Sequence, residues 1–203
     1  MKRRHALLLL TAIGCSLHAG CSKNEAVGSQ AGPAASAPSP EAAFSPVKAK
    51  EAYDAASRAT GFAVGRMMAA DAVIVFFDPQ CPHCADLWAA SRPLLDKLTM
   101  VWVPVGFLRQ SSTPQGALIL SAKDPAATMT EHETLLMSQK GGLAVPPDVN
   151  ADVVAKVKAN TELLRKLGAD GVPLILYRNR KTGAYGAHVG TVTGARLLEM
   201  VGA

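Results

Sequence analysis

A buried-strand pattern that runs directly into a pair of cysteines constrains this chain more than any other feature. Residues 72–77 are a continuous apolar run, AVIVFF, and such a run predicts a strand buried on both faces. The run stops at Asp78-Pro79, and Cys81-Pro82-His83-Cys84 follows, with Pro82 suited to the first turn of a helix. The pattern therefore predicts a strand that leads into a helix, with the cysteine pair at the helix N-terminus.

The position of the two cysteines predicts redox chemistry. Unpaired backbone N–H groups and the helix dipole favour negative charge at a helix start, so the thiolate of Cys81 is expected to be stabilised. His83 can add a positive charge or a donor beside the same sulfur. Cys84 lies one turn further along and can attack a mixed disulfide formed at Cys81. A stabilised thiolate favours the reduced pair, which predicts an oxidising disulfide near roughly −120 mV.

Two other interpretations of the cysteine pair are weaker. A zinc site needs four ligands, and the other histidines and cysteines of the chain have no matching spacing, so no metal and no cofactor are expected. An inert structural disulfide is disfavoured by the placement at a helix start. We expect the remaining histidines to be surface or packing residues and the tryptophans to be core residues; these are His132, His188, Trp88 and Trp102.

The rest of the chain alternates between strand and helix patterns, which predicts an α/β layered structure with a mixed sheet. Pro93 is expected to kink the helix that follows the cysteines, or to mark its weak point, within an apolar stripe that continues to Leu98. The other predicted elements are a helix from Val47 to about Arg58, a strand at 100–108 interrupted by Pro104, helical structure at 113–137, a helix at 151–167 capped by Asn150, strands at 172–177 and 184–189, and a final helix capped by Thr193.

The first 46 residues are expected to be a targeting signal and a tether. Residues 1–21 begin with three cations, continue with an apolar stretch from Ala6 to Ile13 and end in small residues, as bacterial export signals do. Cys15 and Cys21 each follow a lipobox-like sequence, so either could be lipidated, with Cys21 favoured by the polar residues after it. Cleavage by ordinary signal peptidase, which leaves a soluble protein, is the alternative. Residues 22–46 are rich in Ala, Pro and Ser and are predicted to be a tether.

The basic net charge belongs mainly to that signal. The chain carries +5 at pH 7, and removing the three cations at positions 2–4 leaves 18 basic and 16 acidic residues, a net charge of +2. Such a balance does not indicate a nucleic-acid partner or a basic membrane surface. Membrane contact is therefore expected only through an N-terminal lipid.

A second motif, Gly171-Val172-Pro173, begins a predicted strand late in the chain. A proline at this position can be cis, which is rare and marks a specific structural feature. It can equally be a trans proline at a strand edge. The sequence leaves both alternatives open.

These motifs together resemble the catalytic domain of the DsbC/DsbG family of periplasmic thiol:disulfide interchange proteins, and DsbG members most. The resemblance runs from about Val73 to Gly202, through FDPQCPHC at 77–84, Arg92-Pro93, SAKDPA at 121–126, LGA at 167–169 and Val172-Pro173. It implies a thioredoxin-like fold over residues 71–203, a mixed central sheet flanked by helices, with a helical insertion at about 109–168. Residues 47–70 are then expected to be an N-terminal helix and linker.

The same resemblance implies roles for the motif residues. Cys81 would be the nucleophile, Cys84 the resolving cysteine, and Pro82 and His83 would tune the redox potential. Pro173 would be a cis proline that, with Val172, offers backbone groups to an extended substrate chain. The implied partners are exported proteins with cysteines and a membrane redox partner, and the implied location is the periplasm, with tethering as a lipoprotein where the N-terminal cysteine is modified.

Three departures from the family pattern shape the expected activity. The segment before the first strand is too short for the family's N-terminal dimerisation domain, so a monomer is expected. The Pro-His pair between the cysteines and the Val172 before Pro173 resemble the oxidase DsbA. An oxidase that donates disulfides is therefore expected, with a DsbG-like isomerase or reductase as the first alternative and a lipoprotein assembly factor with an incidental CxxC as the second.

Overall fold

The computed structural model describes residues 44–66 and 71–203. The predicted signal, nearly all of the predicted tether, and both Cys15 and Cys21 lie outside these residues. The elements are α1 (Pro46–Ala56), β1 (Phe62–Gly65), β2 (Val73–Phe77), α2 (Pro82–Ser91), a 3₁₀ helix (Arg92–Leu94), β3 (Thr99–Pro104), α3 (Ser112–Ser121), α4 (Pro125–Met137), α5 (Ala151–Lys166), β4 (Leu174–Arg178), β5 (Tyr185–Val189) and α6 (Gly194–Val201).

The strands form one mixed sheet in the order β1-β3-β2-β4-β5. β2 and β3 are parallel, and the other three pairs are antiparallel. The parallel pair needs a crossover connection, which α2 supplies. β2 lies at the centre of the sheet, and a turn of Asp78, Pro79 and Gln80 joins its last residue, Phe77, to Cys81. The predicted α/β class and mixed sheet are confirmed.

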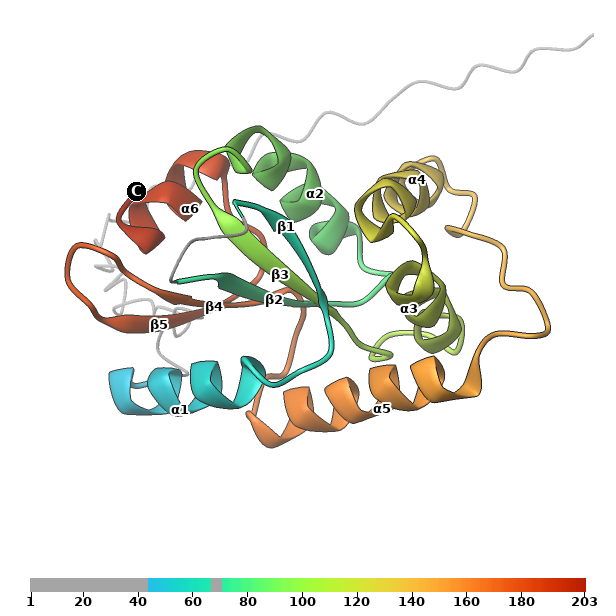
Figure 1. Cartoon of the computed structure of the whole chain (residues 1–203), viewed down its shortest axis with the longest axis horizontal. Helices are drawn as coiled ribbons and strands as arrows, with labels where there is room; N and C mark the ends of the chain where they lie inside the picture. Colours follow the sequence, from blue (N-terminus) through green and yellow to red (C-terminus); the bar gives the residue numbers. More distant parts are fainter. Residues whose placement is uncertain (1–43, 67–70) are drawn as a thin grey trace, which may run out of the picture. The chain divides into compact units, whose positions relative to one another are not determined.

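Helices cover both faces of this sheet, with α2 and α6 on one side and α1 and α5 on the other (Figure 1). All five residues of β2 are buried, as predicted from the continuous apolar run. Because successive side chains of a strand point to opposite faces, Val75 and Phe77 pack with α2 and α6. Ile74 and Phe76 pack with α1 and α5. The core therefore has two halves, one on each face of the sheet, and β2 contributes side chains to both.

The segment predicted to be an N-terminal helix and linker is instead part of the sheet domain. Its α1 packs against β4 and β5, and Phe62–Gly65 forms β1, an edge strand antiparallel to β3. β1 has only four residues, too few for a recognisable alternation, and its pairing partner lies far along the chain. The predicted boundary at residue 71 is therefore wrong, since the sheet begins at Phe62.

Two other elements differ from their predicted bounds. The helical stretch predicted at 113–137 is two helices, because Asp124 caps α4 by accepting from the Ala127 N–H and Pro125 occupies the first turn. The strand predicted at 100–108 ends at Pro104. The N–H groups of Phe107 and Leu108 instead donate to the carboxylate of Asp78. In both cases hydrogen bonds to an aspartate, within the same turn for Asp124 and from a distant part of the chain for Asp78, override the apolar pattern.

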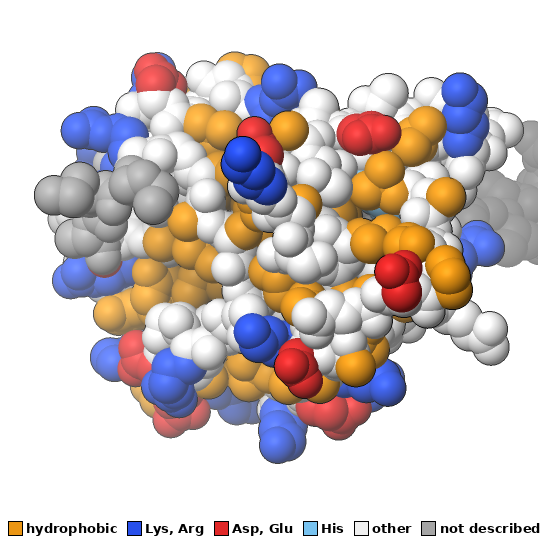
Figure 2. Space-filling view, turned by 45° about the vertical axis from the view of Figure 1, so that its right-hand side comes forward, with side chains coloured by type: hydrophobic (Ala, Val, Ile, Leu, Met, Phe, Trp, Pro, Cys, Tyr) orange, Lys and Arg blue, Asp and Glu red, His pale blue; other side chains and the backbone are white. Residues whose placement is uncertain are grey.

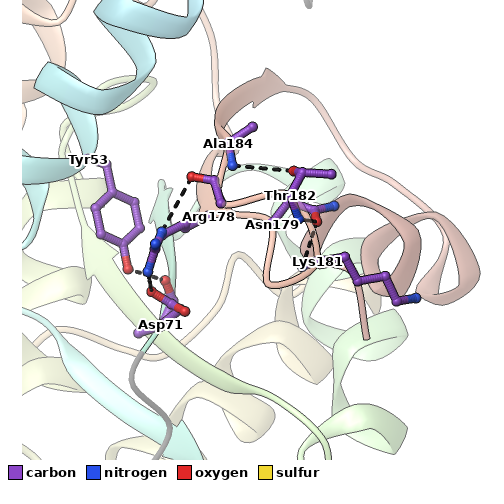
Figure 3. Close-up of polar contacts among 9 residues, drawn as sticks. Tyr53, Asp71, Arg178, Asn179, Lys181, Thr182 and Ala184 are labelled. Carbon is purple, nitrogen blue, oxygen red and sulfur yellow. Dashed lines mark hydrogen bonds and ion pairs between the residues drawn. The ribbon is translucent and has the colours of Figure 1, made fainter.

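A polar cluster fixes α1 to the β4–β5 end of the sheet (Figure 3). The Tyr53 hydroxyl donates to the Ala72 carbonyl at 2.8 Å, and Arg178 forms an ion pair with Asp71 at 3.2 Å. The ring of Tyr185 lies edge-on to Tyr53 and within cation–π distance of Arg178. We call these four side chains, Tyr53, Asp71, Arg178 and Tyr185, the α1 latch.

The surface carries both signs of charge. Figure 2 shows Lys and Arg side chains interspersed with Asp and Glu side chains over the face in view, with hydrophobic groups between them. None of the helices in the described part of the chain is long and apolar enough to cross a bilayer.

Candidate active site

Cys81 occupies the N-cap position of α2, and Pro82 stands in the first turn. The Cys81 carbonyl accepts from the N–H groups of Cys84, at 3.0 Å, and Ala85, at 3.2 Å. The side chain of Cys81 is only 3% exposed and that of Cys84 is fully buried. Both are free thiols in this structure. Cys81 is therefore the more accessible sulfur, and Cys84 lies beneath it.

The surroundings shift the pKa values of the two thiols in opposite directions. The hydrogen bond from the Cys84 thiol, helped by the backbone N–H groups of Cys84 and His83, lowers the pKa of Cys81 against the opposing effects of burial and Asp78. Burial, followed by the interaction with Cys81, raises the pKa of Cys84 well above its ordinary value. A thiolate therefore forms first at Cys81, and Cys84 holds its proton.

The Val172–Pro173 segment lies against the first cysteine. The Cys81 thiol donates to the Val172 carbonyl at 3.5 Å, across 91 residues of sequence. The Val172–Pro173 peptide bond is cis, which is one of the two alternatives that the sequence left open. The Pro173 carbonyl accepts from the Gly190 N–H at 2.8 Å. The start of β4 is thereby held beside the sulfur of Cys81.

Asp78 organises the turn between β2 and the cysteines. Its buried carboxylate accepts from the N–H groups of Gln80, Phe107 and Leu108 at 2.6–2.8 Å, and from the Ser112 hydroxyl at 2.7 Å. Four donors thus compensate for the burial of this carboxylate. Each of these hydrogen bonds is stronger than one between neutral groups, because the acceptor is charged. The turn is thus connected to α3 and to the end of β3.

His132 holds the same turn from α4. This residue is fully buried, so it is not the surface residue that one sequence interpretation allowed. The Leu143 N–H donates to His132 Nδ1 at 3.2 Å, which assigns the ring proton to Nε2, and Nε2 donates to the Pro79 carbonyl at 2.6 Å. Burial lowers the pKa of His132. A neutral imidazole therefore connects α4 and the loop after it to residues 78–84, the turn and the first helical residues that hold the cysteine pair, which we call the cysteine turn.

The close approach of that loop depends on glycine. Gly142 has a φ of +81°, and a Cβ there would lie 2.3 Å from His132 Cε1. A side chain at position 142 would push the loop off the imidazole. Next to it, Gln80 donates to Gln115 Oε1 at 2.6 Å and to the Gly141 carbonyl at 2.8 Å. The helical insertion thus forms one wall of the site.

Glu133, the next residue of α4, is 4% exposed, and its two carboxyl oxygens have no hydrogen-bond partner among the described residues. Burial, and after it the negative charges of Cys81, Asp78 and Asp86, raise the pKa of Glu133 to about 9. Sequence reasoning missed both His132 and Glu133. Their spacing from buried Met129, three and four residues, was the one available signal that this helix face is buried.

The other residues singled out in the sequence lie at the surface, in the core or in a strand. The His83 side chain is exposed, and its Nδ1 lies 3.8 Å from Asp86 Oδ2, so its effect on the pKa of Cys81 comes through the backbone N–H. Trp88 and Trp102 are core residues, as predicted, and their rings pack edge to face. His188 is part of β5 and partly buried. The described residues contain no cluster of three metal-ligating side chains.

Two curated relatives match part of the chain. The thiol:disulfide interchange protein DsbG of Pseudomonas aeruginosa is 32% identical over 134 residues, which are 64% of this chain and 51% of the relative. DsbG of Escherichia coli is 34% identical over 111 residues, 54% of this chain and 44% of the relative. The chain thus spans about half the length of the curated relatives it matches. No family model matches it.

Solved structures match more of the chain at lower identity. The catalytic domain of Proteus mirabilis ScsC is 20% identical with a TM-score of 0.60, covering 78% of this chain and 97% of that one. A periplasmic thioredoxin-like protein of Salmonella enterica serovar Typhimurium is 18% identical with a TM-score of 0.57, covering 74% and 94%. The chain therefore has a thioredoxin-like fold, and over the matched part its sequence is similar to those of the DsbG thiol:disulfide interchange proteins.

Proposed function

We propose that this protein is a thiol:disulfide oxidoreductase that exchanges disulfides with cysteines of other proteins through Cys81 and Cys84. The observation that carries the proposal is the difference in burial and pKa between the two cysteines. Cys81 caps a helix and has a lowered pKa, whereas Cys84 is fully buried and has a raised one. The similarity to DsbG supports the same activity.

The geometry supports an order for the exchange. In the oxidising direction, a substrate thiolate attacks Cys81 Sγ of the Cys81–Cys84 disulfide, and Cys84 leaves with the electron pair of the broken bond. A second substrate thiolate then attacks the substrate sulfur of the mixed disulfide and releases Cys81 as a thiolate. The substrate becomes oxidised and the pair reduced. Val172 and Pro173, beside Cys81 Sγ, would guide the extended substrate chain.

The direction of electron flow follows from which redox state the site stabilises. Interactions that lower the pKa of Cys81 stabilise the reduced pair, so the disulfide form is the better oxidant and donates its disulfide. We therefore favour an oxidase. The second candidate is a DsbG-like isomerase or a reductase of single oxidised cysteines, which the sequence similarity favours.

The proposed setting is the periplasm, with exported cysteine-containing proteins as substrates and a membrane redox partner that renews the active form. The similarity to DsbG and the export-signal pattern of residues 1–21 support this location. Lipid attachment at Cys21 or Cys15 and a monomeric state remain parts of the same proposal.

Two measurements test the proposal. A Cys84→Ala variant, expressed in cells, should accumulate mixed disulfides through Cys81, and their identification would name the substrates. A redox titration should place the Cys81–Cys84 pair on the oxidising side of thioredoxin. A thioredoxin-like potential, with Cys81 held reduced in cells, would contradict the oxidase and support the reductase. Absence of mixed disulfides, with cellular function unchanged in Cys81→Ser, would support a lipoprotein assembly factor.

A further inference from the structure

Each of the three residues that join β2 to Cys81 has a hydrogen bond to a side chain of the helical insertion. The pairs are Asp78 with Ser112 at 2.7 Å, Pro79 with His132 at 2.6 Å, and Gln80 with Gln115 at 2.6 Å. Ser112 and Gln115 belong to α3, and His132 belongs to α4. The insertion therefore holds the backbone that leads into the cysteine pair at every residue between β2 and Cys81.

The contact with His132 is the one that the turn can least replace. Asp78 has four donors, and Gln80 has a second partner in the Gly141 carbonyl. Proline has no N–H group, so the carbonyl is the only backbone hydrogen-bonding group of Pro79. Its donor in the structure is His132 Nε2. Loss of the imidazole therefore removes the bond that fixes this carbonyl.

The imidazole of His132 is itself fixed by the loop after α4. The ring is fully buried, and its Nδ1 accepts from the Leu143 N–H at 3.2 Å. The Gln115 amide group donates to the carbonyls of Gly141 and Leu143 at 2.8 and 2.9 Å, so the loop is bound to α3 as well. A Cβ at Gly142 would lie 2.3 Å from the ring. A ring held in this way can restrain the turn instead of following it.

The two redox states depend on this restraint to different degrees. Cys81 and Cys84 are free thiols here, so these contacts are those of the reduced pair. In the oxidised pair, the sulfur–sulfur bond fixes Cys81 to Cys84 by itself. In the reduced pair that bond is missing, and a Cys81 thiolate gains from the backbone N–H groups at the start of α2 only while it stays close to them. A looser turn therefore costs the reduced pair more than the oxidised pair.

On the basis of the proposed function, we propose that His132 is a positioning residue of the redox pair. Its hydrogen bond to the Pro79 carbonyl holds Cys81 at the N-terminus of α2 in the reduced state, which makes the Cys81–Cys84 disulfide more oxidising. His132 acts through the backbone of the turn, and the exchange of sulfur–sulfur bonds stays with the two cysteines. The helical insertion thereby contributes to the redox potential through one side chain.

The test is equilibration of the full chain with glutathione buffers. Two glutathione thiols reduce the Cys81–Cys84 disulfide to two thiols and become glutathione disulfide, so electrons and protons balance. Alkylation of the free thiols and mass spectrometry give the reduced fraction. In His132→Leu the equilibrium constant for this reduction should fall about tenfold, the factor that one hydrogen bond contributes. The potential then becomes about 30 mV more reducing.

Matched variants separate this role from a general loss of stability. His132→Gln can donate to the Pro79 carbonyl and accept from the Leu143 N–H, so it should restore the equilibrium constant to within about threefold of wild type. Asn179 hydrogen-bonds the backbone at the end of β4 opposite Pro173, where it joins the β4–β5 turn to the end of α6. Asn179→Ala should lower the stability as well, but it should leave the equilibrium constant within about twofold of wild type.

Urea unfolding of the oxidised and the reduced protein gives an independent measurement. His132→Leu should lower the unfolding free energy of the reduced form more than that of the oxidised form, by the amount that the glutathione equilibrium shifts. Equal losses in the two forms, or an equilibrium constant within about twofold of wild type, would overturn the proposal. A shift of the potential in the oxidising direction would overturn it as well.

If His132→Leu does not fold, His132→Phe takes its place with the same outcomes, since it keeps the volume of a ring but cannot donate to the Pro79 carbonyl. A wild type in which glutathione disulfide produces no Cys81–Cys84 disulfide would contradict the proposed function itself. A wild type that forms this disulfide, with an unshifted equilibrium in the His132 variants, would contradict only the role of His132.

Discussion

The cysteine turn and the α1 latch are both polar clusters that join distant parts of the chain, but their groups are paired differently. In the latch, the Tyr53 hydroxyl and the Arg178–Asp71 pair have their partners and lie partly exposed. At the cysteine turn, the groups are buried, and the pKa of Cys81 is lowered whereas that of Cys84 is raised. The carboxyl oxygens of Glu133 there have no hydrogen-bond partner within the described part of the chain.

This difference distinguishes groups that contribute to stability from groups that are suited to take part in chemistry. Partly exposed, paired groups such as those of the latch fix one element to another at small energetic cost. Buried groups with shifted pKa values are costly to keep and are concentrated at functional sites. Both kinds of group occur around the cysteines, since Asp78 and His132 hold the backbone while the pKa values of Cys81 and Cys84 are shifted in opposite directions.

The largest effect is expected from Cys81→Ser. Exchange with a disulfide-containing model peptide should fall by at least about a thousandfold, because serine cannot form the mixed disulfide. Thermal unfolding of the reduced protein should be nearly unchanged. Cys84→Ala is the matched control and should still complete the first attack. Exchange that survives in Cys81→Ser through Cys84 alone would reverse the assigned order of the two sulfurs.

Asp78→Ala should cause the largest loss of stability, about 3 kcal/mol or more, because it leaves the buried donors of four groups without an acceptor. Urea unfolding of the reduced protein measures this loss. Asp96→Ala, at an exposed position, serves as control and should change little. A cost below about 1 kcal/mol for Asp78→Ala would show that the turn does not depend on this carboxylate.

His132→Leu should cost about 2 kcal/mol at pH 7, because the Pro79 carbonyl and the Leu143 N–H lose their partner. His132→Gln, which can donate and accept, should recover part of this loss. The pKa of His132 is lowered in the folded state, so the unfolded chain binds the proton first as the pH falls below about 6.5.

That linkage predicts that wild-type stability decreases as the pH falls from about 6.5 toward the folded-state pKa of His132, and that His132→Leu lacks this component. Urea unfolding of both proteins at a series of pH values measures the difference. The same pH dependence in the two proteins would show that His132 is not held neutral in the folded state.

Tyr53→Phe in the latch should have the smallest effect, about 1 kcal/mol of stability, because it removes one half-buried hydrogen bond to the Ala72 carbonyl. Exchange rates and their pH profiles should not change. A change in the reactivity of Cys81 in this variant would mean that the latch and the cysteine turn are coupled, contrary to the separation described above.

Local sequence patterns predicted the parts of the fold that depend on neighbouring residues. The apolar run at 72–77 identified β2, and Pro82 located the start of α2. At Pro93, where a kink or weak point is predicted, α2 has already ended at Ser91 and a 3₁₀ helix follows. The N-caps Asn150 and Thr193 likewise begin α5 and α6 as predicted. Each of these signals acts within one helical turn or one strand.

The missed features depend on residues that are distant in sequence. β1 is a strand only because β3 pairs with it, and Asp78 collects donors about 30 residues away. His132 reaches the Pro79 carbonyl across 53 residues. The sequence identified the two sulfurs, but the contacts of Cys81 with Val172 and of His132 with Pro79 join residues that only the fold brings together.

The central claim is that Cys81 is the thiolate and Cys84 the protonated thiol of the reduced pair. Alkylation of the reduced wild-type protein with iodoacetamide across a pH series, with peptide mapping by mass spectrometry, tests it most directly. Modification should occur first at Cys81, with a titration midpoint below that of an ordinary cysteine, about 8.5, because its pKa is lowered. Modification first at Cys84, or a midpoint for Cys81 at or above that value, would contradict the account.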